Sequence, residues 1–378
     1  MTPKNRYDLA ELGGAFGDLG TLIPFVVAYI SVLKMDPTGI LLAFGVTLIV
    51  VGMYYRTPFP VQPMKAIGAA AITQTVGGIA ITPTMVVGAG LATGLLWLAL
   101  AASGLAKRLA QWTPKSVLLG LVMGLGFSFM LAGIRQMANG WLVSTALFAL
   151  TLVLLARSRL PATVVLLLFG AVLAVMQHPG LLDELARIRP AVHLPALAWP
   201  TLGWQDLWMG TLWLALPQLP LTFGNALIAI TEENNRRFPD RPVSERTVAF
   251  STGFVNLCSS AIGGIPMCHG AGGMAGHVRF GARTGGASVM LGLLLTTLGL
   301  FFADSVATLF RLFPASVLGV LLFLAGAELA LASRDAQLEK ADRFIVLATA
   351  AFAVLNVGVA VVFGLLAHHA SKRGWLRV

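Results

Sequence analysis

Residues 57–68 read TPFPVQPMKAIG, and this stretch decides the fold. Its prolines, Pro58, Pro60 and Pro63, fix an extended backbone and remove N–H donors, so no regular helix can run through them. Residues 263–270, GGIPMCHG, interrupt a second apolar region in the same way, with glycines in front of Pro266. Each interruption is followed by a short apolar piece, which predicts two half helices in corresponding parts of the chain.

The composition around these stretches is that of a membrane protein. Of 378 residues, 57% are hydrophobic and only 11% are charged, with a mean hydropathy of +0.83. Soluble domains carry about 25% charged residues, and outer-membrane barrels show alternating polarity over about 10 residues instead of long apolar runs. We therefore predict an all-α polytopic protein. Non-helical backbone at membrane depth needs protein or water around it, so both interruptions are expected inside the bundle.

Two pairs of matching tripeptides suggest an internal repeat. Phe16-Gly17-Asp18 is followed after 47 residues by the Pro63 motif, and Phe223-Gly224-Asn225 is followed after 43 residues by the Pro266 motif. Either tripeptide alone would carry no information in a chain so rich in Gly and Phe. Together they place the same two features in the first and third segments of each half.

The apolar runs predict seven segments in each half of the chain. Those of the first half are 12–33, 38–55, 63–77, 84–105, 117–137, 140–156 and 161–177. Those of the second are 207–231, 247–262, 266–277, 286–303, 314–332 and a block 343–369, which Asn356-Val357-Gly358 is expected to split in two. The predicted organisation is a first repeat 1–177, a connector 178–206, a second repeat 207–369 and a cytoplasmic tail 370–378. An odd number of spans per repeat makes the two repeats inverted.

The basic residues predict the orientation. With the amino terminus in the cytoplasm, 20 of the 26 Lys and Arg residues fall inside and 5 fall outside, as the positive-inside rule requires, while Lys65 stays in the membrane. The net charge of +10 is explained by this rule, so no nucleic-acid partner is expected. Asp8 and Glu11 break the apolar start, so no cleaved leader is expected. These observations predict a multi-pass protein of the inner (plasma) membrane with both termini cytoplasmic.

The two half helices predict an anion site. The first N–H groups of a helix lack intrahelical partners, and its dipole places about half a positive charge at that end. Inverted repeats bring two such ends together near the bilayer midplane, where Lys65 adds a full charge and His269 a further donor. A small oxyanion suits this cradle. The predicted substrate-binding residues are Gln62, Pro63, Met64, Lys65, Ala66, Asn225, Pro266, Met267, Cys268, His269, Gly270, Ala271 and Gly272.

Each of these residues also has a structural interpretation. Lys65 could extend its stem toward an interface, although a start near the midplane makes this difficult. His269 could satisfy a carbonyl within the bundle. Cys268, His269 and His277 resemble a metal site only loosely, since there is no fourth ligand, and no metal or cofactor is expected. The glycine-rich run 270–276 could serve close helix packing, ligand approach, or both.

Asp18 is the candidate proton carrier, with His269 second. An ionisable residue inside a predicted span is costly and usually faces a cavity or a partner. Its repeat counterpart is the neutral Asn225, and a structural pair with Lys65 is the alternative. Glu232 and Glu233, just past a predicted span end, are expected in a solvated loop. The sequence has no P-loop, zincin helix or other catalytic motif, so no enzyme is predicted.

Four stretches carry a family resemblance: ELGGAFGDLGTLIPF from Glu11, TPFPVQPMKAIGAAAI from Thr57, QLPLTFGNALIAITEENNRRFPDRPVSER from Gln218 and GGIPMCHGAGGMAGHVRFGARTGG from Gly263. They resemble the molybdate transporter family, a branch of the sulfate permease superfamily. The likeness runs from Glu11 to Gly286, and PVQPMKAI and PMCHGAGG are its most specific parts.

The resemblance implies a fold of seven plus seven inverted segments, shared with nucleobase permeases, in which segments 1–4 and 8–11 form a core domain and the others a gate domain. It implies an anion held between segments 3 and 10, homodimers, and molybdate as substrate, with sulfate or tungstate near relatives. We therefore expect secondary active uptake of a tetrahedral oxyanion coupled to protons. The alternatives are a sulfate transporter, a nucleobase permease on the same fold, or a membrane sensor that does not transport.

Overall fold

The computed structural model describes residues 4–73, 75–76, 79–106, 108, 113–157, 162–198, 201–331 and 338–375. Within these ranges the chain is almost entirely helical, with two pairs of two-residue strands. Five helices are long and apolar enough to cross a membrane, or up to seven if each of two bent helix pairs counts as one span. The protein is thus a helical polytopic membrane protein, as its composition predicts.

The helices of the first half follow the predicted segments closely. The first segment is broken into α1, a 3-10 turn at Phe16–Asp18 and α2. The half helix α4 follows the short strand β1, as the prolines require. The elements are α1 (Leu9–Ala15), α2 (Leu19–Ser31), α3 (Pro37–Tyr55), β1 (Gln62–Pro63), α4 (Lys65–Thr73), β2 (Thr75–Val76), β3 (Ile79–Ala80), α5 (Pro83–Ala102), α7 (Lys115–Met137), α8 (Trp141–Arg157) and α9 (Ala162–Gln177).

The second half repeats this order. Its first segment is one helix that runs without a break from Trp204 to Arg237. Two stretches of this helix, η4 and η5, are π-helical. The elements are α11 (Trp204–Gly210), η4 (Thr211–Ala215), α12 (Leu216–Leu221), η5 (Thr222–Ala229), α13 (Ile230–Arg237), α14 (Glu245–Ala261), β4 (Met267–Cys268), α15 (Ala271–Arg279), α16 (Gly286–Phe301), α17 (Val306–Phe310), α18 (Ala315–Leu331), α19 (Lys340–Leu355) and α20 (Val357–Lys372).

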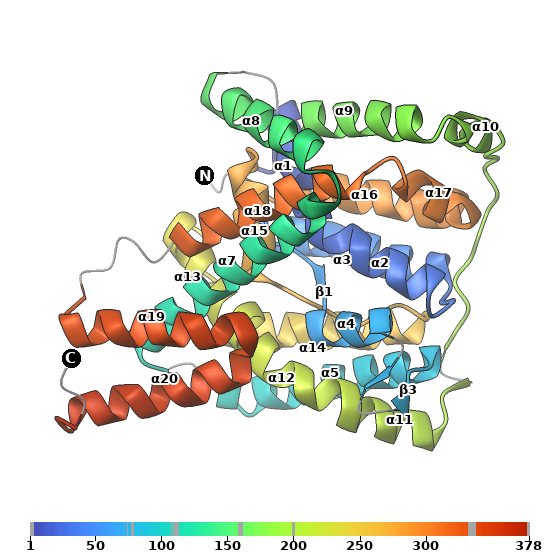
Figure 1. Cartoon of the computed structure of the whole chain (residues 1–378). Coiled ribbons are helices and arrows are strands. Elements are labelled where there is room, and N and C mark those ends of the chain that lie inside the picture. Colours follow the sequence, from blue (N-terminus) through green and yellow to red (C-terminus); the bar gives the residue numbers. More distant parts are fainter. Residues whose placement is uncertain are drawn as a thin grey trace.

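The helices pack in two groups. In the core group, α3 packs against α16 and α5 against α14 and α11. In the gate group, α7 packs against α18 and α19, and α19 against α20. Segment 2 therefore pairs with segment 11 and segment 4 with segment 9, which is the exchange that an inverted repeat produces. Both chain ends lie on the left of the molecule in Figure 1, which we call the terminal side.

Close backbone contact holds the gate group together. A Cβ atom added at Gly126 on α7 would lie 2.6 Å from the Gly326 carbonyl oxygen on α18, and one added at Gly326 would lie 2.6 Å from the Gly126 oxygen. The pair Gly133 and Gly319 repeats this contact two turns further on. Such approach maximises packing contacts between helices that gain no hydrophobic free energy from association in lipid. The helices α7 and α18 thus form one unit.

The connector crosses the side opposite the chain ends. It contains the short helix α10 (Gly180–Ala186) and then runs in extended form to α11, along the right of Figure 1. Its backbone is tied to the ends of two core helices: the amide of His193 donates to the Leu300 carbonyl at 2.8 Å and that of Ala198 to the Ala261 carbonyl at 3.0 Å. The predicted limits of the repeats, 1–177 and 207–369, remain a proposal.

The structure corrects one prediction and confirms another. Residues 232–237 do not form a solvated loop, because the helix continues through them as α13. Glu233 is only 2% exposed and accepts hydrogen bonds from Arg236 and Arg237, three and four residues on, which compensates its burial. The final apolar block is divided at Asn356, as predicted: its backbone is extended between α19 and α20, and its side chain caps α20 by accepting from the Val359 amide at 3.0 Å.

Candidate functional site

The two interrupted stretches meet in the interior of the protein. Strands β1 and β4 pair antiparallel, with Gln62 opposite Cys268 and Pro63 opposite Met267. The Met64 amide donates to the Pro266 carbonyl at 3.0 Å. Because α4 starts at Lys65 and α15 at Ala271, this short ladder brings the beginnings of the two half helices together. All four paired residues are buried.

Side-chain amides cap both half helices. The Ala66 amide in the first turn of α4 donates to Gln218 Oε1 at 2.7 Å, and the Ala271 amide at the start of α15 donates to Asn225 Oδ1 at 3.1 Å. Gln218 and Asn225 lie on α12 and η5 of the same continuous helix. The predicted cradle is therefore only partly open, since one amide of each half helix already has an acceptor. The further positive charge at the predicted cradle must come from the Lys65 side chain.

Lys65 carries an unpaired charge in the protein interior. Its Nζ atom is buried and has no hydrogen-bond partner in the part of the chain that the structure describes. The nearest feature is the ring of Phe129 on α7, whose centroid lies 3.7 Å from Nζ. Burying an ammonium without a hydrogen-bonded partner is costly, and a ring face offsets only about 1–2 kcal/mol of that cost. Lys65 does not reach an interface. An anion beside its ammonium would supply the hydrogen-bond acceptor that the described residues do not provide.

Asp18 belongs to a small polar cluster behind Lys65. Its Oδ1 accepts hydrogen bonds from Gln62 Nε2 at 2.5 Å and from Thr21 Oγ1, and Gln62 Nε2 also lies 3.1 Å from Thr21 Oγ1. Asp18 is 6% exposed. No hydrogen bond joins Asp18 to Lys65 among the described residues, although the two groups interact electrostatically, so a structural pair between them stays a prediction. Gln62 Oε1, by contrast, is buried without a partner within the described ranges.

The two histidines near α15 occupy separate places. His269 is fully buried, with Nδ1 2.9 Å from the Pro60 carbonyl oxygen and Nε2 2.7 Å from Ser251 Oγ. Since a carbonyl only accepts, Nδ1 carries a hydrogen, which matches the structural interpretation of this residue. His277 Nδ1 lies 2.8 Å from the Gly14 carbonyl oxygen. These partners separate the histidines, so Cys268, His269 and His277 do not form a ligand set.

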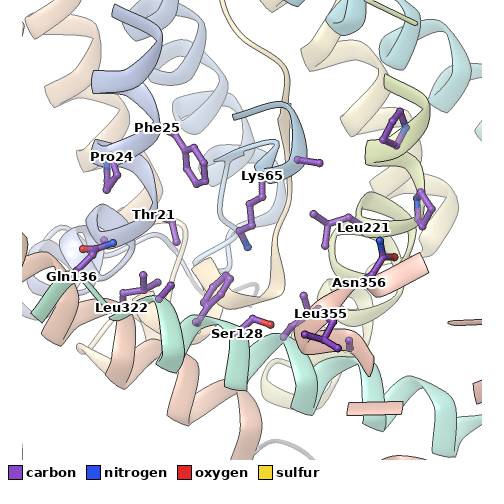
Figure 2. Close-up of a pocket in the computed structure, with 18 residues that line it drawn as sticks. Thr21, Pro24, Phe25, Lys65, Ser128, Gln136, Leu221, Leu322, Leu355 and Asn356 are labelled. Carbon is purple, nitrogen blue, oxygen red and sulfur yellow. The ribbon is translucent and has the colours of Figure 1, made fainter. Parts of the chain in front are cut away.

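A cavity of about 490 Å³ lies between the core and gate groups beside Lys65. Figure 2 shows the Lys65 side chain extending from its helix toward the helix that carries Ser128. Thr21 borders the cavity on one side and Asn356 on another. Of the predicted substrate-binding residues, Lys65 and Ala66 line it. The buried residues behind its wall are Gln62, Pro63, Met64, Asn225, Pro266, Met267, Cys268, His269, Gly270, Ala271 and Gly272.

Two glycines allow this close assembly. A Cβ atom at Gly270 would lie 1.9 Å from Gln62 Oε1, and one at Gly272 would lie 2.0 Å from Cε2 of Phe129. Real Cβ atoms do not approach other atoms so closely, so a side chain at either position would displace its neighbour. The sequence left two interpretations of the glycine-rich run 270–276, close helix packing and ligand approach. The structure shows the close packing directly. It places the start of α15 against Gln62 and Phe129.

Gly270→Ala is expected to abolish most transport while leaving the protein folded. The added methyl group pushes Gln62 aside and breaks the hydrogen bond from Gln62 to Asp18, which is worth about 1.5–3 kcal/mol when the acceptor is charged. Gly180→Ala is the matched control, because nothing lies within 4 Å of its added Cβ. Uptake into proteoliposomes of radiolabelled molybdate, the substrate that the sequence resemblance implies, measures the effect of both substitutions. Uptake by the Gly270 variant equal to that of the control would contradict the assembly described here.

Sequence reasoning did not identify Thr21 or Phe129 as contributors to the site, and it predicted Gln218 only as a polar residue that could line it. Thr21 lies three residues after Asp18, one helical turn away, and this spacing was a usable signal. Gln218 was noted as a polar residue in a predicted span, but its capping of α4 depends on the packing of α12 against α4. Phe129 is one of 21 phenylalanines, and no pattern in the sequence distinguishes it from the others as a site residue.

Half helices that meet beside a mainly apolar cavity with one lysine on its wall, within a bundle of apolar helices, define a multi-pass membrane transporter. The chain belongs to the molybdate transporter family: the family's sequence model, described as "Molybdate transporter of MFS superfamily", matches residues 10–129 and 210–329. The two matches have equal length and fall one in each predicted repeat. The resemblance noted from the sequence is thereby confirmed, and the protein is a transporter, not an enzyme.

The matching curated proteins are similarly named. The chain is 31% identical to "Molybdate transporter 2" of Arabidopsis thaliana, over 94% of this chain and 85% of that protein. It is 30% identical to "Molybdate transporter 1" of the same plant, over 90% and 83% of the two chains. A "Molybdate transporter 1" of Chlamydomonas reinhardtii is 28% identical, over 94% and 90%.

Solved structures that superpose on the chain include a bicarbonate transporter and an anion transporter of the solute carrier 26 family. The transmembrane domain of the cyanobacterial bicarbonate transporter BicA superposes with a TM-score of 0.58 at 16% identity, covering 94% of this chain and 96% of that one. SLC26A9 superposes with a TM-score of 0.61 at 12% identity, covering 97% of this chain and 65% of that one. At these identities the likeness establishes the fold alone, and this fold is the inverted-repeat architecture that the sequence predicts.

Proposed function

We propose that this protein imports molybdate by secondary active transport, coupled to protons. The observation that carries the proposal is the buried Lys65 ammonium, which has no hydrogen-bond partner in the described part of the chain and stands at the start of a half helix on a cavity wall. A tetrahedral dianion completes this environment, because it supplies negative charge and acceptor oxygens for both Lys65 and the nearby helix dipoles. The names of the relatives favour molybdate over sulfate.

Uptake of a dianion requires a coupling ion. Entry into a cell with a negative interior is opposed by about 2.3 kcal/mol per charge per 100 mV. Asp18 is the proposed proton carrier, because its carboxylate is buried and accepts a hydrogen bond from Gln62, which lies three residues before the start of α4 at Lys65. His269 is the second candidate, although its ring nitrogens already have protein partners.

Alternating access is proposed to move the core group against the gate group. The cavity lies between the two groups, so a relative displacement would expose its contents to one membrane face and then the other. The terminal side is proposed to be cytoplasmic, since the predicted topology assigns 20 of the 26 Lys and Arg residues to the side of the amino terminus. Location in the inner membrane and homodimerisation are parts of the same proposal.

Competition binding to the purified protein tests the substrate. Molybdate is expected to displace radiolabelled tungstate at lower concentrations than sulfate does, and uracil is expected not to compete. Sulfate displacing the label as well as molybdate would reassign the protein to sulfate transport, and displacement by uracil would reassign it to nucleobases. Absence of binding by every oxyanion would contradict the anion site itself.

A further inference from the structure

Phe129 lies between the two half helices although it belongs to the gate group. It is carried by α7, and its side chain is 5% exposed. One face of its ring lies over Lys65 Nζ of α4, 3.7 Å from the ring centroid. Its Cε2 atom lies 2.0 Å from where a Cβ atom at Gly272 of α15 would be, so it touches the first turn of that helix. The ring therefore fills the space between the ammonium and the start of α15.

This space has the electrostatic character of an anion site. The ammonium of Lys65 borders it on one side, and the positive end of the α15 dipole borders it on the other. The face of an aromatic ring carries the negative part of its quadrupole, which is why cations are attracted to it. The ring of Phe129 thus offers Lys65 a weak substitute for the charge of an oxyanion. A ring and an oxyanion cannot both occupy the space.

The ring can leave this position only with its own helix or by rotating into the adjoining cavity. Its Cβ atom lies 2.7 Å from where a Cβ atom at Gly326 would be, so it is packed against α18. Because α7 and α18 are in backbone contact through their glycines, a displacement of the gate group carries Phe129 with it. The neighbouring residues Ser128 and Ala132 border the cavity of about 490 Å³, which offers room for a rotated ring.

We propose that Phe129 is a plug that occupies the oxyanion position in the empty transporter and couples occupancy of the site to the position of the gate group. The proposal rests on the proposed function, which supplies the oxyanion. It adds that binding requires withdrawal of the ring from Lys65 and Gly272, and that an empty site draws the ring back. Phe129 is a positioning residue, since it acts by competing with the substrate for Lys65.

Removing the ring is expected to tighten oxyanion binding. Phe129→Ala deletes the competing contact, and molybdate should bind about 2- to 30-fold more tightly, the range that corresponds to a lost cation–π contact. Phe129→Leu keeps most of the side-chain volume and should show the same direction of change if the alanine variant folds poorly. Phe127→Ala is the matched control, because Phe127 lies on the same helix but is 43% exposed. Isothermal titration of the detergent-solubilised proteins with molybdate measures all four.

A second measurement needs no substrate. In a Cys258→Ser parent, which lacks the exposed cysteine, Lys65→Cys places a thiol beneath the ring, and Cys268 remains buried. The rate of modification by an anionic methanethiosulfonate reagent, corrected for the parent, should rise about tenfold or more when Phe129→Ala or Phe129→Leu is added. Phe127→Ala should leave it unchanged.

The two measurements separate the plug from the transport proposal. If the wild-type protein binds no oxyanion, the proposed function fails, and the modification rates still decide whether Phe129 covers Lys65. Binding by Phe129→Ala and Phe129→Leu that is equal to or weaker than that of Phe127→Ala would overturn the competition. Modification rates that do not respond to either Phe129 substitution would overturn the plug.

Discussion

Lys65→Met is expected to weaken molybdate binding by about tenfold or more and to raise the thermal stability of the empty protein. Binding falls because a charge-assisted hydrogen bond is worth about 1.5–3 kcal/mol. Stability rises because the ammonium is buried without a hydrogen-bond partner in the described ranges, whereas the methionine side chain fills similar space without a charge. Equilibrium binding of radiolabelled molybdate and a thermal-shift assay without ligand measure the two effects.

The opposite signs of these effects identify Lys65 as a functional residue. If Lys65 had a structural role, its replacement would lower the thermal stability of the protein. Lys372→Met is the surface control, because Lys372 lies exposed in the last turn of α20, and it should change neither quantity. Lys65→Arg retains the charge and is expected to keep part of the affinity. Binding by Lys65→Met within twofold of wild type would remove Lys65 from the site.

Asp18→Asn is expected to abolish the acceleration of uptake that the proposed proton coupling predicts for an inward acid gradient. Proton-coupled uptake is faster when the outside is more acidic, and an amide at position 18 cannot take up the proton. Asparagine has nearly the shape of aspartate, and its Oδ1 can still accept from Gln62 and Thr21, so the fold and molybdate binding should persist. Molybdate flux into proteoliposomes, with and without the gradient, measures the response.

Asp304→Asn provides the comparison for this experiment. Asp304 is 83% exposed in its side chain and pairs with His193 on the side opposite the chain ends. Its replacement should leave the gradient response intact. An undiminished response in Asp18→Asn would exclude Asp18 as the carrier, and a matching loss in His269→Gln would transfer that role to His269.

The sequence was sufficient to predict most of the fold because the decisive residues act locally. Prolines at 58, 60 and 63 prevent a helix regardless of what surrounds them, so the extended crossing and the start of α4 were predictable. The division at Asn356 was predictable for a related reason, since 27 apolar residues exceed one comfortable span. The helical continuation through Glu233 was missed because a charged run reads as a solvated loop, while its stability comes from ion pairs that form only in the helix.

The site was predictable only as far as its backbone and its charge. The meeting of the two half-helix starts and the location of Lys65 at one of them were predicted from the matched motifs of the two halves, whereas the pairing of β1 with β4 was not. The residues that complete the site come from other helices and depend on tertiary packing. Gln218 and Asn225 cap the half helices because one helix passes both starts, and Phe129 reaches Lys65 because α7 packs across the core group. No local pattern in the sequence marks such contacts.

The helix that carries Gln218 and Asn225 links the two half helices, because it caps both of them. These residues are seven positions apart and hold α4 and α15, which are also joined to each other through β1 and β4. The two half helices that frame the proposed anion site are therefore expected to move together as one rigid unit. A difference in affinity between the two membrane faces should then come from side chains of the gate group, such as Phe129, and not from a change in the half helices themselves.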